Sequence, residues 1–328
     1  MQSDESEGNA MLPSARPAVS VIMANYNGSK HLADAVGSVL AQTVDDIEVI
    51  IVDDASTDES GEIIRLLAAT DARVRAVLLT PNGGPARARN RGLDLAQGEW
   101  IAIVDADDLI TPDRFERLME AAEKADVDVV ADDLLYFVDG AQPHARLLQH
   151  VTSALPLFVT AEMFVRGRSS AGESVAFGYL KPLIRSTLLG GKRYDETLTI
   201  GEDYDLLLRL LLEGGDLCVV REAMYRYRRH SKSLSHRLSA PALRAMIASQ
   251  DRFVAHNGPF ATSLAAAFQQ RRTELLTRVR FEELVAAIKA RRVMDAVASM
   301  LRHPALLPRL GQSFAEGLTR RLRGKVAG

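Results

Sequence analysis

GEWIAIVDADD, residues 98–108, is an apolar run that ends abruptly in carboxylates. The apolar residues 100–104 predict a buried strand. Asp105, Asp107 and Asp108 then follow within four positions. Carboxylates this close repel one another, and a divalent cation that prefers oxygen ligands supplies the compensating charge. The alternative is a solvated acidic turn in which Asp108 caps a helix.

Three earlier apolar runs alternate with helical spacing and predict further strands and helices. Strands are expected at 19–24, 47–52 and 74–79, and helices at 29–42, 61–69 and 86–96. This alternation predicts an α/β fold with a mostly parallel central sheet flanked by helices. Ligands bind beyond the carboxyl ends of such strands. The loops at those ends are 25–28, 53–58 and 105–108.

The second half of the chain is less regular. Thr111 is the expected cap of a helix with Pro112 at its first position. The remaining expectations are a strand within 126–138, a mobile loop over 139–178, an apolar helix opened by Gly201-Glu202-Asp203, and helices over 240–300.

Composition sets the broad class of the protein. The 328 residues, of which 47% are hydrophobic, suffice for one large domain plus an appendage. A net charge of −3 gives no basic excess for nucleic acid. The single cysteine, Cys218, indicates a reducing compartment. Residues 1–17 are polar, unlike a signal peptide, and no window approaches the ~18 apolar residues of a membrane span.

Other polar groups have a functional and a structural interpretation. Asp53 and Asp54 can accept hydrogen bonds from a ribose or a base, or can form an Asx-turn. An ionised carboxylate at Glu202-Asp203 suits a general base, or Asp203 is simply a helix cap. The stretch YRYRRHSKSLSHR, residues 225–237, suits a diphosphate, with His230 as a metal ligand, or is a basic surface loop.

Five ordered blocks of the chain resemble glycosyltransferase family 2, whose members have the GT-A fold. The blocks are VSVIMANYNGSKHLADAVGSVLAQ (19–42), IEVIIVDDASTDES (47–60), GGPARARNRGLDLAQGEWIAIVDADD (83–108), YDETLTIGEDYDLLLRL (194–210) and YRYRRHSKSLS (225–235). The polar composition of residues 1–17 predicts a disordered tail. The resemblance implies a GT-A domain over 18–236 and a helical C-terminal extension over 237–328.

The resemblance also implies roles for matching positions. Nucleotide-sugar contacts fall on Asn25, Tyr26, Asn27, Asp53, Asp54, Arg89, Asn90, Asp105, Lys181 and Glu202. Asp105 and Asp107, with His230 nearby, would bind Mn²⁺ or Mg²⁺, and Asp203 would be the catalytic base. Lys181 and Arg185 are expected near the sugar or the acceptor.

The implied activity is an inverting transfer of a sugar, expected to be glucose, from a UDP-sugar donor. The whole chain is similar to bacterial exopolysaccharide enzymes of the succinoglycan type, which act on a lipid-linked oligosaccharide acceptor. This implies a cytoplasmic protein at the inner face of the membrane, and the basic C-terminus agrees with peripheral association with that membrane, although a solvated helical cap explains it equally well.

Three other protein classes use comparable carboxylates. A phosphatase of the haloacid dehalogenase type places its aspartates after the first strand, whereas Asp105 follows the fourth. A receiver domain would end near residue 130. A non-catalytic nucleotide-sugar-binding protein with the GT-A fold is the main alternative, and retention of Asp105, Asp107 and Asp203 argues against it.

Overall fold

The structure is a computed structural model that describes residues 16–142, 145–153, 156–229, 238–308 and 310. The chain divides into two compact units. The first comprises Met1–Glu196 and Glu202–Ser231, and the second comprises Thr197–Gly201 and Lys232–Gly328. The domain boundary expected at residue 236 lies outside the described residues.

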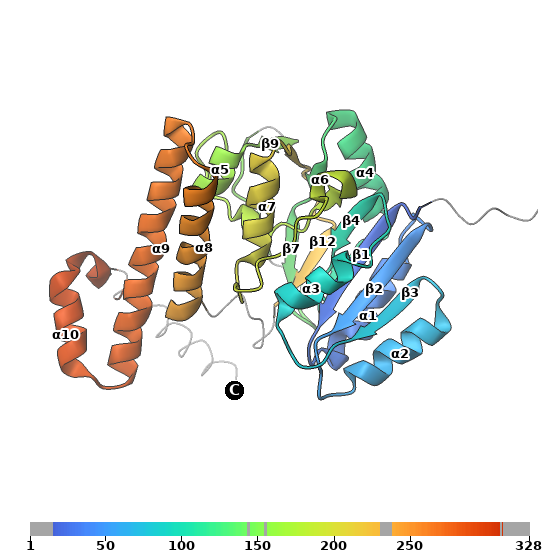
Figure 1. The fold of residues 1–328 in the computed structure, drawn as a ribbon, viewed down its shortest axis with the longest axis horizontal. Helices are drawn as coiled ribbons and strands as arrows, with labels where there is room; N and C mark the ends of the chain where they lie inside the picture. Colours follow the sequence, from blue (N-terminus) through green and yellow to red (C-terminus); the bar gives the residue numbers. More distant parts are fainter. Residues whose placement is uncertain (1–15, 143–144, 154–155, 230–237, 309, 311–328) are drawn as a thin grey trace, which may run out of the picture. The chain divides into compact units, whose positions relative to one another are not determined.

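An eight-stranded sheet forms the centre of the first unit (Figure 1). Four neighbouring parallel strands make up one half: β3 (Val74–Leu78), β2 (Ile47–Asp53), β1 (Val19–Asn25) and β4 (Trp100–Ile103). The sheet continues through β10 (Leu183–Arg185), β6 (Val129–Ala131), β11 (Leu217–Val219) and β9 (Leu157–Val159), of which β6 and β11 are parallel to each other. The expected mostly parallel central sheet is therefore confirmed.

Helices bury both faces of this sheet, because alternate residues of each strand point to opposite sides. The helices of the first unit are α1 (Ser29–Leu40), α2 (Ser60–Thr70), α3 (Pro85–Leu93), α4 (Arg114–Ala125), α5 (Ala161–Arg166), α6 (Ser186–Leu189) and α7 (Glu202–Leu212). Val21 and Met23 share a core with residues of α1 and α4. Ile22 points to the opposite face, where it lies against Gly92 of α3.

A second, four-stranded sheet lies in the same unit. Its order is β5 (Leu109–Ile110), β12 (Tyr225–Arg228), β7 (Leu134–Phe137) and β8 (Ala145–Arg146). Tyr225 pairs with Ile110 and Arg226 with Leu109, in antiparallel register. Strand β12, which comes late in the sequence, is therefore tied to the residues that directly follow Asp108.

Two expectations about the second half were wrong. The segment 139–178, expected to be an irregular loop, contains β8, β9, α5 and the 3₁₀ turn η1 (Phe177–Tyr179). These pieces are too short to show a period in the sequence. Helix α4 begins at Arg114 rather than at Pro112, because the Thr111 hydroxyl donates to the Asp113 carboxylate, 2.9 Å away, instead of capping the helix.

The second unit is helical, as expected. It contains α8 (Ala240–Asn257), α9 (Thr262–Lys289), α10 (Val293–Arg302) and the 3₁₀ turn η3 (Pro304–Leu306). Leu243 and Ile247 of α8 pack against Leu275 and Val279 of α9. Within the described residues, none of the helices is both long and apolar enough to cross a membrane.

Two glycines allow a test of the packing around β1. A Cβ on Gly98 would lie 2.5 Å from the backbone nitrogen of Ser20, whereas a Cβ on Gly37, an exposed position of α1, meets no atom within 4 Å. We expect Gly98→Ala to lower the free energy of unfolding by about 1–3 kcal/mol through overpacking. Gly37→Ala should raise it by about 0.5–1 kcal/mol, because alanine favours the helix.

Urea denaturation of both variants measures the two free energies. Equal effects of the two substitutions, or a neutral Gly98→Ala, would contradict the close approach of residue 98 to β1.

Candidate active site

The carboxyl ends of β1, β2 and β4 lie at one edge of the main sheet. The parallel register places Asn25 opposite Asp53, and Ile22 opposite Ile103. Loops that follow these strands must therefore meet at this edge. The Asn25 side-chain amide donates to the Asp53 carboxylate at 2.7 Å, which joins the first two loops directly.

The carboxylates of Asp53 and Asp54 organise the loops around them. Asp53 accepts hydrogen bonds from the backbone nitrogen and hydroxyl of Ser56, at 2.9 and 2.6 Å. Asp54 accepts from the backbone nitrogens of Gly83 and Gly84, at 2.9 and 2.6 Å. Asp53 thus bonds the backbone three residues on, as a capping side chain does, and not two residues on as in an Asx-turn. A contact of either residue with a nucleoside stays a prediction.

Asn27 and Tyr26 complete this loop pair. Asn27 adopts a left-handed φ of 51°. Its backbone nitrogen donates to the Ser56 hydroxyl at 2.8 Å, and its side-chain oxygen accepts from the backbone of Thr57 at 2.8 Å. Tyr26 is 55% exposed, so its ring is available to a ligand on this edge.

Two buried cations and three carboxylates form what we call the charged cluster: Arg89, Lys181, Asp105, Glu202 and Asp203. Arg89 contacts Glu202 at 2.6 Å and Asp105 at 2.9 Å, and lies 3.8 Å from Asp203. Lys181 contacts Asp105 and Asp203, each at 2.8 Å. The side chains of Arg89 and Lys181 are only 7% and 6% exposed. The cluster joins four segments of the chain: α3, the loop after β4, the residues before β10, and the start of α7.

The charges in the cluster set the pKa of its members. Burial raises the pKa of Asp203, but Arg89 and Lys181 outweigh it and leave this pKa below its ordinary value. The pKa of Asp105 is lowered by Lys181 and Arg89 in the same way, against the effect of burial. Burial lowers the pKa of Lys181, and the carboxylates of Asp105 and Asp203 more than reverse this. Both aspartates and the lysine are thus ionised at neutral pH.

Glu202 differs from Asp203 because burial dominates. Its pKa is raised by burial and by Asp203, although Arg89 opposes the shift.

Asn90 contacts the cluster through Tyr194: its side chain bonds the backbone nitrogen and oxygen of Tyr194 at 2.7 and 3.1 Å. Tyr194 lies beside Arg89, whose guanidinium carbon is 5.6 Å from the ring centroid. Contact of Asn90 with a nucleotide stays a prediction.

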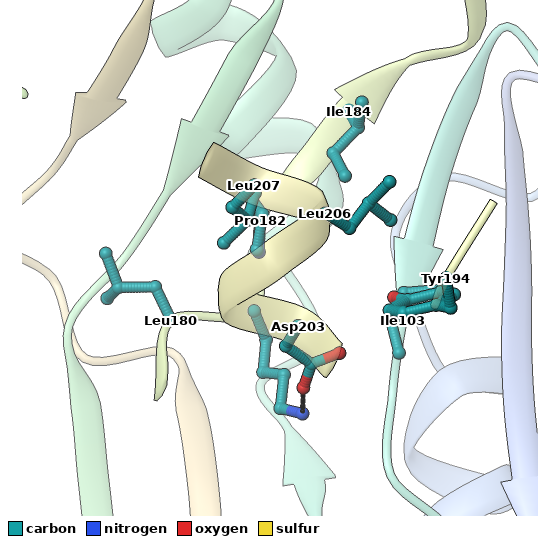
Figure 2. Close-up of a pocket in the computed structure, with 9 residues that line it drawn as sticks. Ile103, Leu180, Pro182, Ile184, Tyr194, Asp203, Leu206 and Leu207 are labelled. Carbon is teal, nitrogen blue, oxygen red and sulfur yellow. Dashed lines mark hydrogen bonds and ion pairs between the residues drawn. The ribbon is translucent and has the colours of Figure 1, made fainter. Parts of the chain in front are cut away.

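An apolar pocket adjoins the cluster. Ile103, Leu180, Tyr194, Leu206 and Leu207 line it together with Lys181, Pro182, Ile184 and Asp203. Figure 2 shows Asp203 on the first turn of α7, with Leu206 and Leu207 one turn further along that helix. Low polarity on one side of the carboxylates strengthens their attraction to the two cations.

Strand β12 holds the loop 105–108 in place. The Tyr225 hydroxyl accepts from the backbone nitrogen of Asp105 at 3.1 Å and donates to the Asp108 carboxylate at 2.8 Å. The backbone nitrogen of Arg228 donates to Asp108 at 2.7 Å, and its Nε donates to the Asp107 carbonyl at 2.6 Å. Burial and the neighbouring Asp105 and Asp107 raise the pKa of Asp108. Asp108 is therefore a buried anchor and not a helix cap.

The residues expected to bind a metal fit that role in part. Asp105 and Asp107 are half-buried and offer the oxygen ligands that Mg²⁺ and Mn²⁺ prefer. Within the charged cluster, three carboxylates face two cations. Within the described residues, however, no three His, Cys, Asp or Glu side chains are grouped to hold an ion. His230, the third expected ligand, lies outside those residues.

A fully buried ion pair, which the sequence did not predict, supports both sides of the site. Arg114 Nη2 contacts Asp132 at 2.8 Å and also donates to the carbonyl oxygen of Lys181. The other carboxylate oxygen of Asp132 accepts from the backbone nitrogens of Met224 and Tyr225, at 2.9 and 2.7 Å. This pair thereby fixes the backbone of Lys181 and Tyr225, whose side chains both reach Asp105.

One signal could have identified this pair. Asp132 and Asp133 directly follow a buried strand, much as Asp53 and Asp54 lie at the end of β2. Arg185, expected near the sugar or acceptor, lies elsewhere: it pairs with Trp100 at the start of β4, the end opposite Asp105. There it bonds Glu99 and Asp128, at 2.7 and 2.8 Å.

Comparisons with known sequences agree with this geometry. The sequence model of Glycosyl transferase family 2 matches residues 20–181. The chain is 34% identical to the succinoglycan biosynthesis protein ExoO of Rhizobium meliloti (strain 1021), over 93% of this chain and 87% of that protein. It is 29% identical to ExoU, a second succinoglycan biosynthesis protein of that strain, over 95% and 91% of the two chains.

Solved structures share the fold. TarS residues 1–349 of S. aureus, in complex with UDP-GlcNAc, superposes with a TM-score of 0.61 at 21% identity, over 79% of this chain and 72% of that one. The mannosyltransferase PcManGT of Pyrobaculum calidifontis, in complex with GDP-Man and Mn²⁺, gives 0.60 at 17% identity, over 93% and 81%. The expected GT-A fold is confirmed by this likeness.

Removing the buried arginine tests how far the site depends on it. Arg114→Leu should lower the free energy of unfolding by about 3–5 kcal/mol, because Asp132 stays buried without its cation. Arg117→Leu is the matched control: Arg117 lies on the same helix, and its side chain is 46% exposed in its contact with Glu222. It should cost about 1 kcal/mol or less.

Chemical denaturation followed by circular dichroism measures both losses. Similar losses for Arg114→Leu and Arg117→Leu would contradict the assigned role of the buried pair.

Proposed function

This chain belongs to glycosyl transferase family 2, and from that premise we propose that it transfers a sugar from a UDP-sugar to a hydroxyl group of a growing bacterial exopolysaccharide. The sugar is glucose, the transfer inverts the anomeric carbon, and the acceptor is a lipid-linked oligosaccharide. The observation that carries the proposal is the charged cluster, in which Arg89 and Lys181 form ion pairs with both Asp105 and an ionised Asp203.

The donor site is proposed at the edge formed by the loops after β1, β2 and β4. Asn25, Tyr26, Asn27, Asp53 and Asp54 would surround the nucleoside, since they lie together in this structure. The TarS complexes with UDP and UDP-GlcNAc support a uridine donor, whereas the PcManGT complex holds GDP-Man. A donor panel must therefore include both nucleotides.

Asp203 would accept the proton of the acceptor hydroxyl. One carboxylate oxygen, Oδ2, is bonded to Lys181 at 2.8 Å, while Oδ1 lies 3.8 Å from Arg89. Oδ1 is thus the oxygen better placed for an incoming hydroxyl. A lowered pKa keeps Asp203 ionised at neutral pH, as a base requires. The nucleoside diphosphate is a good leaving group, so no general acid is needed.

Negative charge develops on the diphosphate as its bond to the sugar breaks. Arg89 and Lys181 are fixed cations that can stabilise this charge without reorganising. Asp105 and Asp107 would hold Mn²⁺ or Mg²⁺, which would act as a Lewis acid toward the diphosphate oxygens. Glu202 would keep Arg89 oriented through its contact of 2.6 Å. A cytoplasmic location at the inner face of the membrane follows from the lipid-linked acceptor.

Substitution of the proposed base tests the reaction. With wild-type protein, Mn²⁺ and a lipid-linked oligosaccharide, UDP release from UDP-glucose should exceed release from other UDP-sugars and from GDP-mannose. Asp203→Asn should lower kcat by about 10²–10⁴-fold, because the amide cannot take the proton. Its affinity for the donor, measured by calorimetry, should change little.

Asp205→Asn is the matched control, because Asp205 lies on the same helix and is bonded to Arg209 at 3.0 Å. It should keep most of the wild-type kcat. Wild-type turnover by Asp203→Asn would refute the base assignment. Donor binding without turnover by the wild-type protein, with every acceptor tried, would favour a non-catalytic nucleotide-sugar-binding protein.

Removal of the metal tests the second part of the proposal. EDTA should abolish turnover, and added Mn²⁺ or Mg²⁺ should restore it. Asp107→Asn should weaken Mn²⁺ binding in the presence of UDP by about tenfold or more, followed by electron paramagnetic resonance. Asp113→Asn, at the exposed start of α4, should leave Mn²⁺ binding unchanged.

Equal Mn²⁺ affinity in Asp107→Asn and wild type would remove Asp107 from the metal site. Full turnover in EDTA would show that Arg89 and Lys181 suffice to stabilise the leaving group.

A further inference from the structure

Helix α10 leaves four large apolar side chains in solvent. Val293, Met294, Val297 and Leu301 are 67%, 80%, 41% and 78% exposed, respectively. At 100° per residue they fall within an arc of about 100° on one side of the helix. We call these four residues the α10 stripe. Isolated exposed apolar residues need no explanation, but a contiguous stripe on one helix face indicates a partner.

The α10 stripe is separate from the face that anchors the helix. Ala296 is buried and Met300 partly buried, and they pack with Leu284 and Ala287 of α9. Figure 1 shows α10 beside the end of α9, within the second unit. The helix therefore has its own small core, and the stripe contributes nothing to it. Substitutions in the stripe should leave the fold intact.

Basic side chains accompany the stripe. Arg291 and Arg292 precede it and Arg302 follows it, and all three are exposed. Asp295, the one acidic residue of the helix, is paired with Arg292 at 3.3 Å. Residues 289–328 contain nine lysines and arginines against two acidic residues, a net charge of +7. Since the whole chain carries −3, residues 1–288 carry −10. Positive charge is thus concentrated at the end of the chain that carries the stripe.

We propose that α10 docks on an anionic lipid bilayer, with the α10 stripe in the interfacial region and the flanking arginines on lipid phosphates. An apolar helix face beside cationic side chains is the composition that binds such an interface. A second copy of the chain is a poorer occupant, because a two-fold contact would bring like arginines together. Residues 311–328 of the same chain are a poorer occupant for the same reason: they are net positive, and the arginines beside the α10 stripe would repel them.

Docking through α10 would explain the membrane location proposed above. The docking proposal itself does not depend on the transfer reaction. Vesicle flotation of the full chain measures it directly. Wild-type protein should bind vesicles of phosphatidylcholine mixed with phosphatidylglycerol at least about tenfold better than phosphatidylcholine alone, with loss of binding at high salt. The double variant Met294→Glu/Leu301→Glu should bind the mixed vesicles about tenfold less well than wild type.

Leu66→Glu/Leu78→Glu is the matched control. Both residues are exposed apolar side chains of the first unit, 65% and 41% exposed, and the charge change is the same. It should bind mixed vesicles as wild type does. Equal binding by the two double variants would overturn the proposal, as would wild-type protein that ignores phosphatidylglycerol. UDP binding of each preparation, measured by calorimetry, separates failed docking from a failed donor site.

Light scattering distinguishes lipid docking from the other occupant considered, a second copy of the chain. A wild-type dimer that Met294→Glu/Leu301→Glu converts to a monomer, without vesicle binding by either protein, would overturn lipid docking and assign the stripe to self-association. Unchanged thermal midpoints of the variants would exclude unfolding as the cause of lost binding.

Discussion

Mutual repulsion among carboxylates is the constraint on which this site depends. Parallel strands bring the acidic loop after β4 to the same sheet edge as the loops after β1 and β2, and helix α7 contributes Glu202 and Asp203 there. The buried cations Arg89 and Lys181 offset part of that concentration of negative charge. Because Arg89 belongs to α3 and Lys181 immediately precedes β10, the compensation also joins segments that are remote in sequence. The ion pairs that hold these segments together at the sheet edge are therefore also the ones that set the charge of the site.

The same arrangement lowers the basicity of Asp203. Cations that keep Asp203 ionised also make it a weaker proton acceptor, since its pKa lies below the ordinary value. In the proposed reaction a weak base would be adequate, because the nucleoside diphosphate is a good leaving group. Glu202, whose pKa is raised, contacts Arg89 and not Lys181. Two adjacent carboxylates on one helix turn thus have different environments, as the separate roles proposed for them require.

The sequence predicted the half of the molecule in which local pattern decides structure. Buried strands end in polar loops between residues 19 and 108, and the expected edge of loops is present. It did not predict Arg114 and Asp132, or the contact of Tyr225 with Asp105 and Asp108, because these join segments 18 to 120 positions apart and leave no local period. Strands of three residues, such as β9 and β11, escape detection for the same reason. The roles of individual polar residues came from resemblance to a family, not from pattern.

The chain crosses between its two units in an unusual place. Thr197–Gly201 groups with the second unit, although Glu196 and Glu202 on either side belong to the first. Thr197 bonds Arg252 of α8 at 3.3 Å, and Gly201 has a φ of 92° that few other residues would adopt. A protein shortened at residue 231 would keep these five residues and lose the helix they bond. The segment directly before Glu202 and Asp203 would then lose its bond to α8, so the first unit is not separable by a single cut.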